Sequence, residues 1–283
     1  MNNQIFNKSK SFNIRGELFF LDSPKIMGIL NVTDDSFYDG GRYVKIKDIL
    51  KRVEIMLDEG ADFIDIGAQS SRPGAKEIGS EQELERLIPA IKAIRKEFPQ
   101  ALLSVDTWHS EVARVVTDEG ADIINDISGG TFDDKMFETI ASLNVPYVLM
   151  HTGGRPENMQ KNPSYDDVVQ DVLFFLSEKI RQLHLLGLSD IIIDPGFGFG
   201  KTLEHNYELM NALEHFTFLE KALLVGISRK SMIYKALGIT PDEALAGTTA
   251  LNMFALQKGA DILRVHDVKE AKQTIEVFRL LKN

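Results

Sequence analysis

The sequence predicts an α/β fold, an eight-stranded (β/α)8 TIM barrel with a short N-terminal hairpin. Eight apolar runs of strand length are each followed by a polar or glycine residue and, along most of the chain, by a helical pattern. Connections before the strands are short, whereas several after them are long. The length of 283 residues fits one barrel, so we expect residues 1–283 to form a single domain. A doubly wound sheet is the alternative, but it usually has fewer units and a switch in strand order.

The segment 11–22 precedes the first strand and predicts the hairpin. Two short alternating runs flank Arg15-Gly16-Glu17, and such runs around a glycine-containing turn are typical of two paired antiparallel strands. We expect this hairpin to cover one end of the barrel.

The predicted barrel strands are short apolar runs, typical of parallel strands that are buried on both faces. In chain order they are Lys25–Leu30, Asp62–Ile66, Ala101–Val105, Ala121–Ile124, Pro146–Met150, Ile191–Ile193, Ala222–Ile227 and Asp261–Asp267. Because the strands of such a barrel all run in the same direction, their C-terminal ends should meet at one mouth.

Amphipathic helices are predicted between strands, because apolar residues recur there every three or four positions. Such faces include Ile49, Val53 and Leu57; Leu84, Leu87 and Ile91; Val172, Leu176 and Ile180; and Ala271, Ile275 and Phe278. Three capping patterns predict helix starts. They are Ser80 with Glu83, Thr240 with Pro241 and Glu243, and Asp267 with Glu270. Three similar junctions, at 58–62, 118–122 and 257–261, contain Gly-Ala-Asp, whose glycine suits a left-handed helix end.

Composition excludes several classes of function. The net charge is -10 and no block of basic residues occurs, so we expect no nucleic-acid partner. The chain has no cysteine, which excludes disulfides, thiolate metal sites and a cysteine nucleophile. There is no apolar run of about 18 residues, and the first ten residues are too polar for a signal peptide. We therefore expect a cytoplasmic protein with no membrane partner.

Three polar residues stand at the ends of different strands: Asp106, Asn125 and Asp194. Two carboxylates and an amide in one pocket suit a heterocycle whose edge offers several N–H donors. Taken singly, each residue could equally be a helix cap or a turn residue. Their shared position at strand ends favours a binding site.

The last strand places Arg264 within an apolar run and His266 at its end, and barrel closure would bring both near Asn31. A buried arginine needs an anionic partner, so this set could hold a phosphate or diphosphate, with Asn31 as an oxygen ligand of Mg²⁺. The alternative is an arginine–carboxylate pair that closes the barrel seam.

A glycine-rich segment, 194–202, resembles a P-loop but has Pro195 where that motif has its first glycine. We interpret it as a tight turn that places an aromatic ring over the pocket; a purely structural turn is the alternative. Lys230, after the seventh strand, could donate hydrogen bonds at the pocket edge or be a solvated lysine. The loops 31–42 and 67–75 are long, and we expect them to close over a substrate.

Taken together, the motifs resemble those of the dihydropteroate synthase family, in order and over essentially the whole chain. The matching stretches are Met27–Thr33, Asp35–Phe37, Ser70–Ala75, Ser104–Thr107, Asn125–Gly129, Asp194–Lys201, Ser228–Ser231 and Arg264–Asp267. The resemblance implies a barrel enzyme that condenses 6-hydroxymethyl-7,8-dihydropterin diphosphate with p-aminobenzoate, giving 7,8-dihydropteroate and diphosphate in folate biosynthesis. It also implies Mg²⁺ as cofactor, sulfonamides as inhibitors and a homodimer.

The resemblance also implies roles for residues. The pterin-binding set comprises Asp106, Asn125, Asp194 and Lys230. Arg264 lies along the pterin and joins His266 and Asn31 around the diphosphate and Mg²⁺. The aminobenzoate surroundings are Ser71, Arg72, Pro73, Phe199, Lys230, Ser231 and Phe37. Asp35 approaches the reacting carbon, so the catalytic residues would be Asp35, Lys230 and Arg264.

The sequence departs from the family pattern in its loops. Asp34 replaces a usual proline, Ala68 a glycine and Gln69 a glutamate, and Thr152-Gly153-Gly154 lacks a common arginine. These changes bear on loop closure and aminobenzoate affinity. The chemistry needs no covalent nucleophile, because the dihydropterin ring can spread the positive charge left when diphosphate departs.

Two other functions stay open at this point. A methyltetrahydrofolate methyltransferase that works with a corrinoid protein would keep the Asp/Asn pocket but would not need Ser70–Ala75 or Lys230. A pterin-binding regulator that has lost catalysis is supported only by the loop departures. Asn31, Asp35 and Arg264 argue against it.

Overall fold

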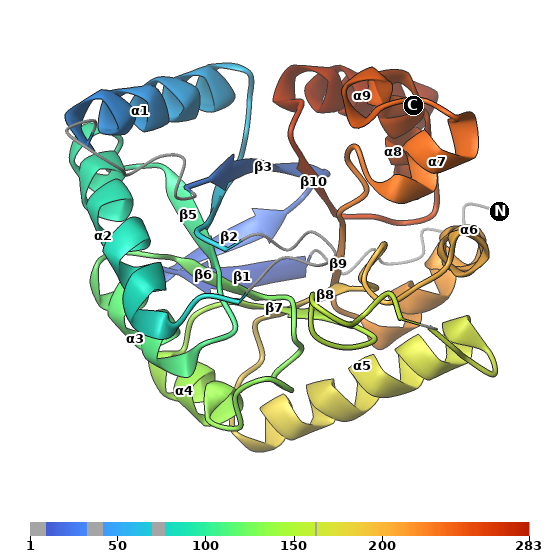
Figure 1. Cartoon of the computed structure of the whole chain (residues 1–283), viewed down its shortest axis with the longest axis horizontal. Helices are drawn as coiled ribbons and strands as arrows, with labels where there is room; N and C mark the ends of the chain where they lie inside the picture. The colour runs from blue at the N-terminus through green and yellow to red at the C-terminus, as the bar shows by residue number, and fades with distance from the viewer. Residues whose placement is uncertain (1–9, 33–41, 70–76, 162, 283) are drawn as a thin grey trace, which may run out of the picture.

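A closed barrel of eight parallel strands forms the centre of the protein, as the sequence predicts (Figure 1). The structure, a computed structural model, describes residues 10–32, 42–69, 77–161 and 163–282. The strand order around the barrel is β10-β3-β4-β5-β6-β7-β8-β9, so the last strand closes against the first strand of the barrel. An antiparallel pair, β1-β2, precedes it.

The strands are short, and most residues of the barrel strands are buried. Their bounds are β1 Lys10–Ile14, β2 Glu17–Leu21, β3 Lys25–Asn31, β4 Phe63–Gly67, β5 Leu102–Asp106, β6 Ile123–Asp126, β7 Tyr147–Met150, β8 Ile191–Asp194, β9 Ala222–Val225 and β10 Ile262–Val265. Hydrophobic side chains on the outer strand faces meet the helices in one large core.

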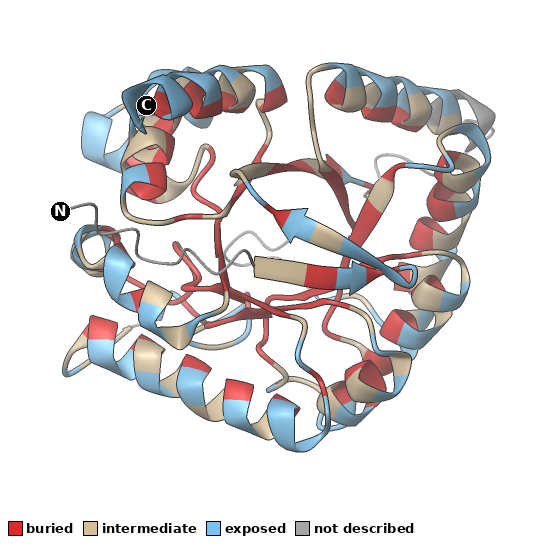
Figure 2. Cartoon of the chain, turned by 180° about the vertical axis from the view of Figure 1, so that it is seen from behind, coloured by how far each residue is buried: buried red, intermediate tan, exposed pale blue. Residues whose placement is uncertain are grey.

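Helices surround the barrel and turn their apolar faces inward, so that buried and exposed residues alternate along each ribbon (Figure 2). They are α1 Arg42–Asp58, α2 Ser80–Glu97, α3 Ser110–Asp118, α4 Met136–Leu143, α5 Val168–Leu185, α6 Leu203–Asn211, α7 Ser231–Leu237, α8 Leu245–Gln257 and α9 Val268–Lys282. Two 3-10 helices, η2 Leu213–Leu219 and η3 Pro241–Glu243, lie between them. None of the described helices is long and apolar enough to cross a membrane.

The segment after β9 differs from the prediction that Thr240 caps the next helix, with Pro241 at its first position. A first helix, α7, already begins at Ser231. The Thr240–Glu243 capping box is present, but it starts only the single 3-10 turn η3, and α8 begins at Leu245. A capping pattern marks a local helical start and does not fix how many turns follow.

The predicted Ser80–Glu83 capping box is wrong. Gly79 is the N-cap of α2, and Ser80 Oγ donates instead to Glu111 at 3.0 Å. Glu83 is fully buried and accepts from Gln69 Nε2 at 3.1 Å. The Asp267 carboxylate likewise binds the guanidinium of Arg229. The side chains of Ser80, Glu83 and Asp267, which the sequence pattern predicts as helix caps, thus bond to residues that are distant in the sequence.

The three Gly-Ala-Asp junctions, at 58–62, 118–122 and 257–261, have the same structure and the same role. Each glycine has φ between 98° and 105°, which confirms the left-handed helix end. Each aspartate then accepts from a backbone N–H at the start of the preceding barrel strand. The bonds are Ile26 N to Asp62 at 2.8 Å, Leu103 N to Asp122 at 2.7 Å and Leu223 N to Asp261 at 2.8 Å. Each aspartate therefore joins its own strand to the preceding strand by a hydrogen bond, at the end of the barrel opposite the mouth.

The N-terminal hairpin covers that end, as predicted (Figure 2). Phe12, Ile14 and Leu21 are buried against the strand side chains inside the barrel. Arg15 and Gly16 form its two-residue turn, both with positive φ. Burying a side chain as large as Phe12 stabilises the fold by about 1.5–3 kcal/mol.

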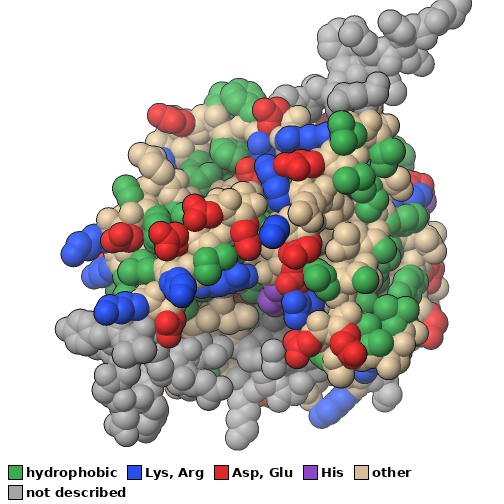
Figure 3. All heavy atoms as spheres, turned by 90° about the horizontal axis from the view of Figure 1, so that it is seen from above, with side chains coloured by type: hydrophobic (Ala, Val, Ile, Leu, Met, Phe, Trp, Pro, Cys, Tyr) green, Lys and Arg blue, Asp and Glu red, His purple; other side chains and the backbone are tan. Residues whose placement is uncertain are grey.

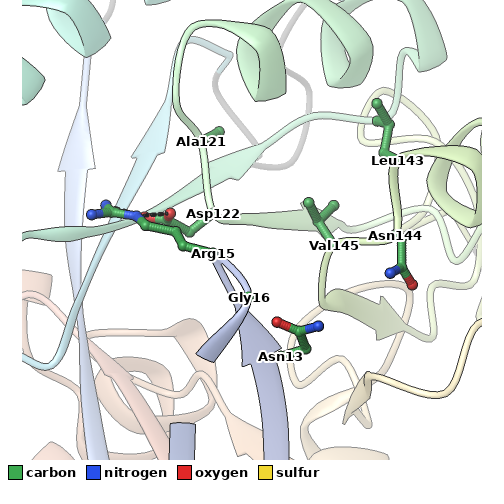
Figure 4. A pocket seen from close by; sticks show the side chains of 8 residues that line it. All are labelled: Asn13, Arg15, Gly16, Ala121, Asp122, Leu143, Asn144 and Val145. Atoms are coloured by element: carbon green, nitrogen blue, oxygen red, sulfur yellow. Dashed lines mark hydrogen bonds and ion pairs between the residues drawn. The ribbon is translucent and has the colours of Figure 1, made fainter. Parts of the chain in front are cut away.

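A pocket of about 270 Å³ lies beside this hairpin turn (Figure 4). In the close-up, Arg15 and Asp122 point toward one another, and Asn13 and Asn144 line another part of the wall. Arg15 already donates to Asp122 at 2.6 Å and to two backbone carbonyls. The polar atoms of this pocket thus hold the hairpin to the barrel.

Candidate active site at the barrel mouth

Four side chains meet at the C-terminal ends of the strands. Asp106 ends β5, Asn125 lies near the end of β6, Asp194 ends β8, and Arg264 lies near the end of β10. Asp106 and Asn125 are register partners in adjacent strands, and Arg264 reaches Asp106 across the barrel at 3.2 Å. Parallel strand direction therefore gathers these residues at one mouth.

Arg264 is bound between two carboxylates. Its Nε lies 2.7 Å and its Nη2 2.6 Å from Asp65 Oδ2, in addition to the contact with Asp106. Burial lowers the pKa of Arg264, but the two carboxylates outweigh burial and raise it. In this state of the protein the arginine has the carboxylate partners that its place in an apolar strand requires.

Asp65, in the middle of β4, is a central residue that sequence reasoning missed. It is fully buried, and its Oδ2 also accepts from Asn125 Nδ2 at 3.1 Å. Its other oxygen has no hydrogen-bond partner within the described residues. The signal was available, because a lone carboxylate in the apolar run Phe63–Gly67 is as costly to bury as Arg264.

The two carboxylates at the strand ends have raised pKa values. Burial raises the pKa of Asp106, although Arg264 acts against it, and the charge of Asp65 adds to the rise. Burial also raises the pKa of Asp194, while Lys230, a backbone N–H bond from Gly196 at 2.7 Å, and Arg264 lower it. Such groups can accept hydrogen bonds strongly from a ligand that brings N–H donors into the mouth.

Lys230 lies at the edge of the same pocket. Its Nζ donates to the Phe197 carbonyl at 2.5 Å and lies 4.6 Å from the centre of the Phe199 ring. Burial lowers its pKa to about 8, and Asp194 partly offsets this effect. Lys230 therefore connects the glycine-rich turn to the carboxylates of the mouth.

Phe199 forms the apolar side of the mouth. It is buried in a small cluster that includes Trp108, Ile127, Met150 and Met159. Trp108 packs edge-on against Phe132, with ring centres 5.8 Å apart. The turn thus places the Phe199 ring beside the amino group of Lys230.

His266 directly follows β10, and Asn31 ends β3, the strand that pairs with β10. Ser228 Oγ is 3.0 Å from His266 Nδ1 and also accepts from the His266 backbone N–H at 3.2 Å. Burial and the charge of Arg264 lower the pKa of His266 to about 4, so its ring is neutral near pH 7. Ser231, the first residue of α7, is partly exposed.

Five residues of the predicted site lie outside the described residues. They are Asp35, Phe37, Ser71, Arg72 and Pro73, together with the departure Asp34.

Gln69, one of the departures, has a physical partner in the structure. Its amide nitrogen donates to the buried Glu83, and its amide oxygen accepts from the backbone N–H of Ile78 at 3.3 Å. Glu83 also lies 2.7 Å from His109 Nδ1, a contact that raises the pKa of His109. A glutamate at position 69 would bring a second carboxylate against Glu83, so the neutral amide suits this environment.

The donor set fits a magnesium ion that arrives with a substrate. Within the described ranges, no group of three or more His, Cys, Asp or Glu side chains could hold a metal ion. Asn31 is exposed at the end of β3 and offers a single amide oxygen. Mg²⁺ is commonly held by one or two protein carboxylates together with waters and substrate phosphates, and Asn31 could supply an amide oxygen to such an ion.

Comparisons with known proteins agree with this geometry. The model of the family described as "pterin binding enzyme" matches residues 27–266. The dihydropteroate synthase of Escherichia coli K12 is 43% identical over 270 residues, which cover 95% of this chain and 94% of that protein.

Solved structures show the same likeness. A Yersinia pestis dihydropteroate synthase with a sulfonamide drug has a TM-score of 0.90 and 39% identity, covering 96% of this chain and 99% of the other. A Xanthomonas albilineans dihydropteroate synthase with 4-aminobenzoic acid has a TM-score of 0.89 and 38% identity, covering 97% and 98%. The chain therefore belongs to the pterin-binding enzyme family and, within it, to the dihydropteroate synthases.

Proposed function

We propose that this protein is a transferase that condenses 6-hydroxymethyl-7,8-dihydropterin diphosphate with p-aminobenzoate, forming 7,8-dihydropteroate in folate biosynthesis. The observation that carries the proposal is the convergence of Asp106, Asn125, Asp194 and Arg264 at one mouth. The family membership of the chain supports the same reaction.

The pterin would be recognised through its N–H edge. Asp106 and Asp194 are acceptors that face a low-dielectric pocket, and Lys230 is a donor at its rim. Asn125 Nδ2 is already committed to Asp65, so its amide oxygen is the atom left to accept from a ligand. This asymmetric set of donors and acceptors would fix both the position and the orientation of a flat heterocycle.

The diphosphate would be held by Arg264, His266 and Asn31. Arg264 would shift part of its bonding from the carboxylates to phosphate oxygens, an exchange between anionic partners that keeps the guanidinium paired. His266, neutral at pH 7, could donate one hydrogen bond. A bound Mg²⁺, with Asn31 as its protein ligand, would supply positive charge that stabilises the departing diphosphate.

The aminobenzoate would lie beside the glycine-rich turn. Phe199 and Ser231 would contribute to its surroundings, together with Ser71, Arg72, Pro73 and Phe37. The Xanthomonas relative was crystallised with 4-aminobenzoic acid and the Yersinia relative with a sulfonamide drug. We therefore propose that sulfonamides compete with aminobenzoate here.

The reaction proceeds through a positive charge that develops on the pterin as diphosphate departs. The bond between the pterin methylene carbon and the diphosphate oxygen breaks, the leaving group keeps the electron pair, and the ring spreads the positive charge. The amine of aminobenzoate then attacks that carbon and loses a proton. Asp35 would approach the cationic carbon, and Arg264 and Lys230 would hold the substrates in line, so electrostatic stabilisation replaces a covalent nucleophile.

A direct assay tests the function. Purified protein, pterin diphosphate, p-aminobenzoate and Mg²⁺ should give dihydropteroate and free diphosphate in equal amounts, and chelation of Mg²⁺ should stop turnover. Methyl transfer from methyltetrahydrofolate to a corrinoid protein would instead identify a methyltransferase. Tight pterin binding without any product would identify a binding protein.

A homodimer and a cytoplasmic location are further parts of the proposal. Large apolar side chains that are at least half exposed occur on α7 and α9: Leu237, Val277, Leu280 and Leu281. In Figure 3 apolar side chains also gather toward one edge of the face that is shown. Sedimentation velocity should give the mass of two chains at micromolar concentration; a single 31.8 kDa species would contradict the dimer.

A further inference from the structure

The glycine-rich turn after β8 has its backbone carbonyls bound by side chains from several elements. Lys201 donates to the carbonyls of Gly196 and Phe199, at 2.9 and 3.1 Å. The other bonds run from Lys230 to Phe197 O, from Gln160 to Gly198 O and from Tyr165 to Gly200 O. The turn is therefore held from its inner side by Lys201 and from the mouth side by Lys230.

Lys201 is an unusual lysine because it is only 3% exposed. Its Nζ also lies 2.9 Å from His151 Nδ1 and 3.5 Å from the His151 carbonyl oxygen, so the buried group is surrounded by acceptors. Burial and the charge of Lys201 lower the pKa of His151 to about 2, which keeps that ring neutral and able to accept. Burial also lowers the pKa of Lys201 to about 7, with Asp194 acting against the shift.

The turn fits against the end of β7 so closely that side chains are excluded. A Cβ on Gly196 would lie 1.8 Å from the His151 carbonyl oxygen, and one on Gly200 would lie 2.6 Å from Gly153 Cα. Both glycines have positive φ. This backbone path directs carbonyl oxygens inward, where an ammonium group can bind them.

We propose that Lys201 is a positioning residue for the condensation reaction: its buried amino group fixes the turn so that the Phe197 carbonyl and the Phe199 ring hold Lys230 at the edge of the pterin pocket. This inference rests on the proposed function. Lys201 itself lies under the turn, where the substrates would not reach it.

The connection to Lys230 distinguishes a positioning role of Lys201 from a merely structural one. Lys230 donates to the Phe197 carbonyl and lies over the Phe199 ring, and the Phe199 carbonyl is bound by Lys201. If Lys201 were lost, the Phe199 carbonyl would lack this donor and the turn could relax. Lys230 would then lose a defined position relative to Asp194.

The experiment is a double-mutant cycle on kcat/KM, with pterin diphosphate affinity measured in parallel by calorimetry. Lys201→Met removes the donors at similar length, Lys201→Arg keeps a charged donor, and Lys230→Met removes the residue being positioned. Lys221→Met is the matched control, because Lys221 also binds a backbone carbonyl, that of Ser189, but at the opposite end of the barrel. All rates are taken per folded protein, well below each melting temperature.

Lys201→Met should lower kcat/KM by about 30-fold in the wild-type background but by less than about threefold in Lys230→Met, because coupled residues are not additive. Lys201→Arg should recover part of the loss, and Lys221→Met should leave kcat/KM unchanged. Equal losses in both backgrounds would overturn the proposal. If Lys201→Met does not fold, His151→Phe, which removes one acceptor, should show the same non-additivity with Lys230→Met at smaller size, and additivity there would overturn it equally.

The calorimetric arm separates this proposal from the function on which it rests. Wild-type protein that fails to bind pterin diphosphate would contradict the proposed function itself. Normal binding and turnover in the wild type, with additive effects of the two lysines, would contradict only the positioning role.

Discussion

At the scale of single residues, the mouth is a balance of buried charges. Asp65, Asp106 and Asp194 face Arg264 and Lys230 within one enclosed region. An ionised group buried alone is costly, so each of these charges depends on its counter-charges. Substrates that bring both N–H donors and phosphate oxygens can replace these internal pairs, which makes the site suited to a pterin diphosphate.

Asp194 gives the most direct test of pterin recognition. Asp194→Asn replaces an acceptor oxygen with a donor and removes a charge that balances Lys230. We expect pterin binding to weaken by about 2–4 kcal/mol. Calorimetry with the pterin diphosphate measures this directly, and an unchanged dissociation constant would contradict the role of Asp194.

His151 should contribute to the acid sensitivity of the fold. Its pKa is about 2 in the folded protein, below the ordinary value of 6.5, so its contribution to stability is present above pH 6.5 and is lost as pH falls toward 2. By pH 5 the loss should be about 2 kcal/mol. In urea unfolding, the stability gap between wild type and His151→Phe should therefore narrow by this amount from pH 7.5 to pH 5. If the unfolding free energies of the two proteins changed in parallel with pH, His151 would not be the group responsible for the acid sensitivity.

At the scale of elements, the Gly-Ala-Asp junctions organise the end of the barrel opposite the mouth. Each junction ends a helix, turns the chain and provides a carboxylate that binds a neighbouring strand. Asp122 does more, because it also pairs with Arg15 of the hairpin turn and with Arg95 of α2. One buried aspartate thus joins hairpin, strand and helix.

Asp122→Asn should destabilise the protein strongly. The side chain of Asp122 is 3% exposed and accepts from two arginines and a backbone N–H, so the substitution would leave buried donors with a weaker partner. We expect a loss of about 3–5 kcal/mol in the free energy of unfolding. Asp22→Asn, at an exposed pair with Lys25, serves as the control and should unfold like the wild type. Equal stability of the two variants would show that the junction is not essential.

At the scale of the whole molecule, the barrel separates stability from chemistry. The hairpin and the carboxylates before the strands stabilise one end of the barrel. The charged residues of the mouth lie at the other end. The net charge of -10 opposes the approach of anionic substrates, but salt screens charges beyond about 8–10 Å. Acidic and basic side chains are interspersed on the face in Figure 3. At the mouth, Arg264 and Lys230 supply positive charge beside the carboxylates.

Substrate order is a prediction for the molecule as a whole, based on the two long loops of the sequence. Aminobenzoate should bind tightly only when diphosphate is present, and Asp35→Ala should lower turnover about 100-fold or more while pterin affinity stays nearly intact. A carboxylate aimed at developing positive charge acts mainly in the transition state, where it contributes about 2–4 kcal/mol. Calorimetry with and without diphosphate measures the first effect. Tight binding of aminobenzoate to the free protein would rule out this order.

The sequence by itself determined the barrel, its strand order and the convergence of Asp106, Asn125, Asp194 and Arg264. These features depend on apolar periodicity and on strand direction, which are local properties that the chain carries in its residue pattern. The hairpin that covers one end follows from the same kind of pattern.

Only the tertiary structure decided which side chains pair. Arg264 and Asp65 are 199 positions apart, and Lys201 and His151 are 50 apart, so no local pattern links them. The wrong capping box at Ser80 has the same cause, because Glu83 gains more from buried partners than from its own helix start. Burial makes each unpaired polar group costly, and the closed barrel alone determines which partner is within reach.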